Sequence, residues 1–423
     1  MTGRAGPSQG SPKGEMAFFA PVRIRDDGER PALDSFNWKR LRLFLEPFAN
    51  VTLLAVRAGP ESVAFVGRDA WPSLPDWVGV RLEHGDFHPR GAPRTLRRAL
   101  LSVPVCLAVM IRARQVVRAS DAVGVAWSID PVPVAGLLLA LCYRRPLMTV
   151  TVGSPAAGFG IKAERRRGTV AGAVLGVVAR VAKRAEAVLD ARSSLLFAPG
   201  EERAAGTRHG VAFSTASFSE SDIADREDSI DDGEVRWIHV GGVSYEKGVD
   251  TFLSALAEMR READHGAVLL GARSPLFDLS GQLERLRLTE VVRVAGRVPW
   301  EEALDEMGGA SVLVFLSRHE GMPKAPMEAM AKGLPVIATP TGAEQYVVDG
   351  LNGLLVPVAD PGACVRAVRR VTSDPELRRR LIRGGYDTAR RHSYEAHLAQ
   401  VRAHLCRRFP TLTCDPPRPW PCA

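Results

Sequence analysis

The stretch Glu320-Gly-Met-Pro-Lys-Ala-Pro-Met-Glu328-Ala-Met-Ala-Lys-Gly333 lies between two short apolar runs, Val312–Leu316 and Val336–Thr339. Runs of this length and composition are typical of buried parallel strands. Pro326 suits the start of a helix, and Gly333 suits the left-handed residue that ends one. The stretch therefore predicts a strand, a loop, a short helix and a second strand. Ligands of open α/β sheets bind where such strands pass into helices.

Two carboxylates, Glu320 and Glu328, stand in this stretch. Carboxylates accept hydrogen bonds from hydroxyl groups, and the free N–H groups of a helix start attract phosphate. A ligand with both groups, such as a nucleotide sugar, fits the combination. The alternative is a solvated helix start, where carboxylates interact favourably with the helix dipole.

Two further motifs follow, Leu334-Pro-Val-Ile-Ala-Thr-Pro-Thr-Gly342 and Val348-Asp-Gly-Leu-Asn-Gly-Leu-Leu-Val356. In this order the three motifs resemble the donor half of the family 4 retaining glycosyltransferases (glycosyl transferases group 1). The resemblance covers about residues 235–400, whereas the N-terminal half shares only the alternation of strands and helices. It implies an α/β protein with two Rossmann-like, doubly wound domains facing each other across a cleft, which is the GT-B fold.

The composition is that of a globular protein with two domains. The chain has 423 residues, of which 46% are hydrophobic and 25% charged, and this length exceeds one ordinary core. No run of about eighteen uncharged apolar residues occurs, so we expect no membrane-spanning helix. The six cysteines form no CxxC pair, which favours reduced thiols and a cytoplasmic protein over a zinc site or a disulfide framework.

We expect six segments, with the roles of the domains and the return of the last helix taken from the resemblance. They are a disordered leader (1–15), an N-terminal Rossmann-like acceptor-binding domain (16–212), a linker (213–234), a C-terminal Rossmann-like nucleotide-sugar-binding domain (235–391), a C-terminal helix crossing back to the N-terminal domain (392–409) and a disordered tail (410–423). The linker is rich in Ser, Thr and Asp, so we expect it to be exposed. Within the first domain we expect a long helix over 93–119 that Pro104 kinks or splits, a helix over 168–185 and a strand at 187–189.

The charge distribution suggests a partner. The net charge is +8, and Arg90–Arg118 holds seven arginines and no acid. With a second cluster, Lys162–Arg167, these residues flank apolar helices and suit an anionic membrane surface. The alternative is a solvated, arginine-rich face on ordinary core helices. The basic runs lack interleaved aromatic residues, so we expect no nucleic acid partner.

A glycine-rich loop, His239-Val-Gly-Gly-Val-Ser-Tyr-Glu-Lys-Gly248, follows a predicted strand and matches the family's phosphate loop. Gly241 and Gly242 would let the backbone approach a diphosphate, and Lys247 would neutralise it. The resembled family usually has an arginine in place of Gly242, and the loss of that cation leaves the diphosphate less neutralised. The candidates to replace it are Arg273, Arg318 and Lys324.

The resemblance also implies roles for the other donor-side residues. Glu328 would hold the ribose hydroxyls, and Glu320 would contact the sugar beside the reacting carbon. The remaining donor-binding candidates are Gly321, Met322 and Pro323 along the sugar, Lys324, and Arg297 at the base. Glu320 and Lys247 are the catalytic candidates.

The acceptor-side candidates follow predicted strands of the N-terminal half. They are Asp27, Gly28, Asp130, Gly153 and Ser154, each of which could instead belong to a plain loop. The family often has a histidine where this chain has Val152. His84-Gly-Asp-Phe-His88 alternates metal-ligand types, but a surface loop explains it better, and we expect no metal site.

We therefore predict a retaining, metal-independent glycosyltransferase of the hexosyltransferase type. It would transfer a sugar from a nucleoside-diphosphate sugar to a hydroxyl of a glycan or lipid-linked acceptor, in cell-surface polysaccharide or glycoconjugate biosynthesis. It would need no cofactor besides this co-substrate, and it would be cytoplasmic or peripheral on the inner membrane face. Two alternatives stay open: a nucleotide-sugar epimerase of the same fold, and a catalytically degenerate, nucleotide-sugar-binding partner of a glycan-assembly complex.

Overall fold

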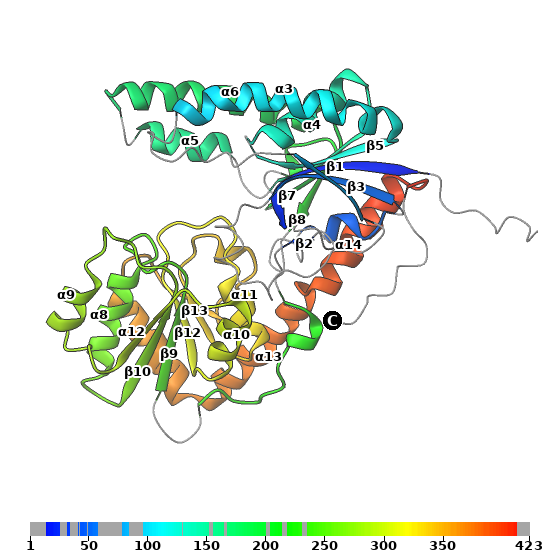
Figure 1. Ribbon diagram of the computed structural model, residues 1–423. Coiled ribbons are helices and arrows are strands. Elements are labelled where there is room, and N and C mark those ends of the chain that lie inside the picture. The colour runs from blue at the N-terminus through cyan, green and yellow to red at the C-terminus, as the bar shows by residue number, and fades with distance from the viewer. Residues whose placement is uncertain are drawn as a thin grey trace, which may run out of the picture. The chain divides into compact units, whose positions relative to one another are not determined.

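The computed structural model describes residues 14–25, 32–33, 41, 43–48, 50–57, 78–83, 96–128, 130–151, 155–164, 167–199, 204–213, 218–230 and 235–412. Contacts between residues divide the chain into two compact units. Unit 1 comprises residues 1–213 and 398–423, and unit 2 comprises residues 214–397. Each unit contains a largely parallel sheet with helices packed against it (Figure 1).

The described strands of unit 1 form an eight-stranded sheet in the order β4-β3-β1-β5-β6-β7-β8. Their bounds are β1 (Glu15–Arg25), β2 (Ala32–Leu33), β3 (Asn50–Arg57), β4 (Val78–Glu83), β5 (Ala122–Trp127), β6 (Leu147–Thr151), β7 (Ser193–Pro199) and β8 (Gly210–Phe213). The short β2 pairs antiparallel with β1, and the other described pairs are parallel. The order reverses between β1 and β5, which is the doubly wound arrangement.

Three helices of unit 1 share one core on the sheet. They are α3 (Leu96–Ala119), α4 (Pro131–Cys142) and α6 (Val170–Arg192) (Figure 1). Val116, Val132 and Leu189, one from each helix, pack in a single cluster with Phe19 and Val125 of the strands. A further helix, α5 (Pro155–Glu164), packs against α6. The three core helices therefore cover the same face of the sheet.

Some local predictions for this unit are wrong. The strand predicted at 187–189 is part of α6, which continues to Arg192, and β7 begins only at Ser193. Ala182, Glu186 and Leu189 are buried at helical spacing, so the apolar periodicity continues past the predicted helix end. Pro104 lies inside α3 without splitting it, and a kink at this residue stays a prediction.

The sheet of unit 2 has six parallel strands in the order β11-β10-β9-β12-β13-β14. Their bounds are β9 (Val235–Val240), β10 (His265–Leu270), β11 (Val292–Gly296), β12 (Val312–Phe315), β13 (Val336–Ala338) and β14 (Leu354–Leu355). The apolar runs Val312–Leu316 and Val336–Thr339 predicted β12 and β13, and these two strands are confirmed. The strand order reverses between β9 and β12, and loops at such a reversal form the ligand crevice of open α/β sheets.

Helices cover both faces of this sheet. Their bounds are α8 (Val249–Met259), α9 (Leu279–Arg285), α10 (Trp300–Gly308), α11 (Ala325–Ala331), α12 (Pro361–Ser373) and α13 (Pro375–Arg391). Trp237 packs in a core with Phe252 of α8 and Val368 of α12. The next residue, Ile238, packs in the opposite core with Met307 of α10 and residues of α11. Successive side chains of β9 thus point to opposite faces, as in any strand.

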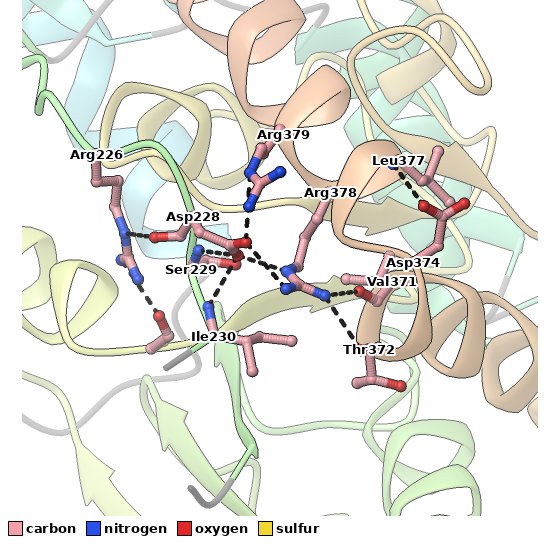
Figure 2. A network of polar contacts seen from close by, with 11 residues as sticks. Arg226, Asp228, Ser229, Ile230, Val371, Thr372, Asp374, Leu377, Arg378 and Arg379 are labelled. Atoms are coloured by element: carbon pink, nitrogen blue, oxygen red, sulfur yellow. Dashed lines mark hydrogen bonds and ion pairs between the residues drawn. The ribbon is translucent and has the colours of Figure 1, made fainter. Parts of the chain in front are cut away.

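The segment 218–230, expected to be an exposed linker, packs on unit 2 instead. It contains a short 3₁₀ helix, η1 (Glu220–Asp222), and the fully buried Phe218. Asp228 is ion-paired with the buried Arg378 of α13, whose guanidinium also donates to the carbonyl oxygens of Val371 at 2.8 Å and Thr372 at 3.1 Å (Figure 2). The carboxylate of Asp228 also accepts hydrogen bonds from two backbone N–H groups of its own turn. Polar side chains that suggested solvation therefore anchor the segment.

The last helix, α14 (Tyr394–Arg408), begins directly after Ser393. Ser393 Oγ accepts a hydrogen bond from the N–H of Ala396 at 3.1 Å, as an N-cap serine does. From residue 398 the chain belongs to unit 1, where Arg408 donates to the carbonyl oxygen of Ser194 at 2.9 Å. The ring of Phe409 lies edge-on to that of Phe48, with 6.2 Å between centroids.

Across the described ranges, no helix combines the length and apolar character that crossing a membrane requires. Four of the six cysteines lie in these ranges, and all four are free thiols.

Candidate functional site

The loops after β9 and β12 leave the same edge of the sheet, because these adjacent strands run parallel. Residues 241–248 follow β9, and residues 316–324 follow β12. The two loops touch at Gly248, which has φ 68°. A Cβ atom at this position would lie 1.9 Å from the carbonyl oxygen of Leu316. Only glycine allows both this backbone conformation and this close approach.

Lys247 and Glu320 form an ion pair between these two loops, although 73 residues separate them in the sequence. The Lys247 side chain is 31% exposed and that of Glu320 is 16% exposed. The two predicted catalytic candidates therefore lie together, where partial burial strengthens charge interactions. A lysine paired in this way is available to an anionic ligand that competes with the carboxylate.

Glu328 lies in α11 and is largely buried. Its Oε1 accepts a hydrogen bond of 3.1 Å from the indole Nε1 of Trp300, at the start of α10. The indole fixes one oxygen of this carboxylate. Trp300 was missed in the sequence, because no local pattern links residues 28 positions apart on two different helices.

Tyr346 binds the backbone of the segment that carries Glu320 and Glu328. Its hydroxyl is buried and donates to the carbonyl oxygen of Pro323. Burial raises the pKa of Tyr346 well above its usual value, and the nearby charges of Glu320, Glu328 and Glu344 raise this pKa further. The Tyr346 hydroxyl therefore fixes the loop that joins Glu320 to α11.

The backbone of 321–323 is held from behind by residues after β13. Gln345, in the 3₁₀ helix η2 (Ala343–Gln345), donates to the carbonyl oxygen of Gly321 at 2.8 Å. At Gly342, with φ 96°, a Cβ atom would lie 2.5 Å from the same oxygen. Gly321 itself is exposed, and a Cβ atom at this position would meet no other atom within 4 Å. The loop thus presents a fixed backbone surface, while Met322 packs against the core.

At Gly242, where the resembled family usually has an arginine, the structure leaves room for a side chain. A Cβ atom at Gly242 would meet only the carbonyl oxygen of Ala272, at 3.9 Å, so the backbone has room for a side chain there. Arg318 is held by Asp250 through two hydrogen bonds of 2.8 Å, and its guanidinium stacks 3.9 Å above the Tyr245 ring. Of the three candidate replacements, Arg318 is therefore already committed to joining the two loops.

Arg273 is better placed to serve the glycine loop. It is exposed, and its backbone forms a parallel bridge with Val243. Lys324 is partly buried at the start of α11. Arg297 follows β11, two strands from β9, so the ion pair and Arg297 stand at different positions along the sheet edge.

His239 lies directly beneath the glycine loop, a position to which sequence reasoning gave no role. Its buried imidazole packs against the rings of Phe252 and Phe315, with centroid distances of 6.0 and 6.5 Å. A Cβ atom at Gly241 would lie 3.6 Å from Nε2 of this ring. Burial, followed by the positive charge of Lys247, lowers the pKa of His239 to about 4. The imidazole under the loop is therefore neutral at neutral pH.

We expect unit 2 to lose stability as the pH falls from about 6.5 toward 4, because only the unfolded chain protonates His239 readily in this range. The pKa of His239 is lower in the folded protein than in the unfolded chain. Burial of the neutral imidazole therefore costs no stability above the unfolded pKa, and the penalty grows below it. The loss approaches about 1.4 kcal/mol per pH unit from this residue. Urea unfolding of the wild type and His239→Leu between about pH 7 and pH 5 measures it. His265 and His392 remain in both proteins, so equal pH dependences would contradict the prediction.

On the acceptor side, Asp130 is the candidate that the structure describes. It is exposed just before α4, and its Oδ2 accepts a hydrogen bond of 2.6 Å from Ser128 Oγ. This turn follows β5, which neighbours β1 at the reversal of the unit 1 sheet. Asp27, Gly28, Val152, Gly153, Ser154 and the stretch His84–His88 lie outside the described residues. Within the described ranges, no three His, Cys, Asp or Glu side chains are grouped as metal ligands.

Residues 221–388, nearly all of unit 2, match the family model described as glycosyl transferases group 1. This range of the chain is therefore similar to the group 1 glycosyltransferases. The family predicted from the motifs around Glu320 is thereby confirmed, and the matched range holds Lys247, Glu320 and Glu328.

Curated relatives of this glycosyltransferase domain match over part of their length. D-inositol 3-phosphate glycosyltransferase of Streptomyces avermitilis is 36% identical over 132 residues, which are 29% of this chain and 28% of the relative. An uncharacterized glycosyltransferase of Methanocaldococcus jannaschii is 29% identical over 166 residues, 39% of this chain and 46% of the relative. The alignments thus span less than half of either relative.

Solved structures show that the likeness in fold extends over nearly the whole chain. HepE of Anabaena, crystallised with UDP-glucose, has a TM-score of 0.63 at 16% identity and covers 93% of this chain and 99% of its own. Sucrose-phosphate synthase of Thermosynechococcus elongatus has a TM-score of 0.65 at 18% identity, with coverage of 93% and 98%. The predicted class of two Rossmann-like, doubly wound domains is confirmed.

Proposed function

We propose that the protein is a retaining glycosyltransferase that takes a sugar from a nucleoside-diphosphate sugar. The acceptor is a hydroxyl of a glycan or lipid-linked molecule in cell-surface polysaccharide or glycoconjugate biosynthesis, and the enzyme works in the cytoplasm or at the inner membrane face. The observation that carries the proposal is the ion pair of Lys247 and Glu320 at the strand reversal of a group 1 glycosyltransferase domain. The complex of the similarly folded HepE with UDP-glucose supports the donor class.

Each donor-side group has a role in this reaction. The ammonium of Lys247 neutralises the charge that develops on the departing diphosphate, a stabilisation that acts most strongly in a partly buried site. Glu320, released from Lys247 by the diphosphate, binds the sugar, whose ring lies along the fixed backbone of 321–323. Glu328, oriented by Trp300, binds the ribose hydroxyls. Arg297 contacts the base.

In the chemical step, the bond between the anomeric carbon and the diphosphate oxygen breaks. The acceptor hydroxyl attacks from the face that the diphosphate leaves, so the anomeric configuration is retained. Its proton passes to the departing phosphate oxygen, which balances the step without a base from the protein. Catalysis then rests on positioning and on electrostatic stabilisation, and Lys247 takes the place that a metal ion would fill.

Arg273 replaces the arginine that the resembled family has at Gly242. Its backbone is paired with Val243 of the glycine loop, and its side chain is exposed at that edge. The residue therefore brings a guanidinium to the diphosphate from the loop after β10, and a guanidinium can bind phosphate through two parallel hydrogen bonds.

Two other functions would use the same donor site. A nucleotide-sugar epimerase would convert the free sugar nucleotide, and a degenerate binding partner would bind it without turnover. Incubation with radiolabelled nucleotide sugars and membrane extract separates the three. Label transferred to an acceptor supports the proposal, an isomerised sugar nucleotide supports the epimerase, and binding without product supports the partner.

A thermal-shift screen of nucleotide sugars tests the donor site directly. We expect one nucleoside diphosphate to raise Tm, and its sugar conjugate to raise it further. At one hundred times Kd, binding contributes about 2.7 kcal/mol, which corresponds to a few degrees for a protein of this size. Glu320→Ala should keep the nucleotide part and lose the sugar-dependent part.

The matched control is Glu301→Ala, an exposed carboxylate on α10, which should behave as the wild type. Equal sugar-dependent shifts in the Glu320 variant and the wild type would exclude Glu320 from the sugar site.

A further inference from the structure

Helix α6 carries an apolar stripe that is not buried. Val170, Val177, Val181 and Val188 are each 40% to 83% exposed. Their spacings of seven, four and seven residues place them within about 40° of one another, at about 100° per residue. The four valines therefore form one straight line along the helix.

This line is separate from the face that packs on unit 1. Leu175, Ala182 and Leu189 are buried residues of α6, and they lie about 100° to 140° around the helix from the middle of the valine line. A surface helix ordinarily carries polar residues in such a position. The valines are thus not explained by the fold of unit 1.

Basic residues flank the stripe. Arg184 and Arg192 are exposed and lie about 40° to either side of it, and Arg180 is exposed nearby. The two acids of α6 do not reach this line, because Glu186 is buried and Asp190 is half-buried on another side. The exposed face therefore combines valines with positive charge and no carboxylate.

Helix α3 repeats the combination. Leu107 and Ile111 are more than half exposed, and the exposed Arg114 and Arg118 continue the same line along the helix. The sequence of α3 contains no acid. Since α3 and α6 pack on the same core, both faces belong to the helical layer on one side of the sheet (Figure 1).

We propose that the exposed face of α6, together with that of α3, binds the surface of an anionic lipid bilayer. The valines enter the boundary between headgroups and acyl chains, and the arginines pair with lipid phosphates. A protein partner of ordinary surface would not require this uniform positive charge. This membrane contact is a property separate from sugar transfer, and the sugar-transfer proposal does not depend on it. Its centre is α6, whereas the sequence pointed to the Lys162–Arg167 cluster.

Flotation with vesicles tests the surface in the full-length protein. We expect binding to phosphatidylcholine vesicles that contain phosphatidylglycerol, and little binding to phosphatidylcholine alone. The double reversal Arg180→Glu and Arg184→Glu should lower the partition coefficient about tenfold or more, since each basic residue near the surface contributes about 1 kcal/mol. Val177→Ser with Val181→Ser should also weaken binding, although the charge is unchanged.

Lys183→Glu is the matched control, because Lys183 is exposed on a different side of α6. The single variant Arg184→Glu changes the net charge by the same amount as Lys183→Glu. Lys183→Glu should weaken vesicle binding much less than Arg184→Glu does. Circular dichroism establishes that each variant is folded. Equal binding to neutral vesicles, equal effects of the two reversals, or a self-associated protein that the valine changes make monomeric would overturn the proposal.

Discussion

Replacing Lys247 with methionine should lower kcat/KM for sugar transfer by about 100-fold or more, the usual loss when one group that stabilises transition-state charge is removed. Methionine keeps the length and apolar stem of lysine but not its charge, so the loop geometry is preserved. The loss should be mainly in kcat, because the charge that Lys247 neutralises is greatest as the diphosphate departs. Steady-state kinetics with the donor identified by thermal shift measures the effect.

Lys332→Met is the control for this variant. Lys332 caps the C-terminal end of α11, away from the ion pair, and its replacement should leave turnover unchanged. If Lys247→Met turned over at the wild-type rate, the assignment of Lys247 to the leaving diphosphate would be wrong. The nucleotide-dependent thermal shift would then show whether the lysine acts in binding alone.

Gly248→Ala should destabilise the protein by about 3 kcal/mol or more, which is the range of severe single substitutions. Two costs add at this position. A left-handed conformation disfavours alanine by about 1 kcal/mol, and the new Cβ would lie 1.9 Å from the carbonyl oxygen of Leu316. The loops after β9 and β12 must separate to relieve the contact, so donor binding should weaken as well.

Gly296→Ala carries only the first cost, so its difference from Gly248→Ala gives the second. Gly296 has φ 75°, close to the 68° of Gly248, but a Cβ atom there would meet nothing within 4 Å. This variant should lose only about 1 kcal/mol. Urea unfolding of both variants gives the comparison, and equal losses would show that the contact between the two loops is not what requires glycine.

The elements of unit 2 were predictable because buried parallel strands are short, continuous apolar runs, and each such run became a strand. The proximity of Lys247 and Glu320 was predictable only through the resemblance, since their separation of 73 residues leaves no local signal. The hydrogen bond from Trp300 to Glu328 could not be predicted from the sequence, because it depends on how α10 and α11 pack.

Composition gave the wrong answer where polar side chains have partners. In residues 218–230 the aspartates and serines suggested a solvated linker, yet Asp228 binds Arg378 (Figure 2). On α6 the apolar composition left open whether the helix belongs to the core or to a membrane-binding surface, and a line of its valines is exposed. Both cases depend on which side of an element faces the rest of the protein, and a single sequence reports this only through periodicity.

Unit 1 is assembled from two distant parts of the chain, and this affects the order of events during synthesis. Residues 214–397 form the whole of unit 2 and emerge before the final segment of unit 1 exists. Phe48 gains its ring contact with Phe409 only after the end of the chain has been synthesised. Domains generally fold as they are completed, so the unit whose strands are made first is the one finished last.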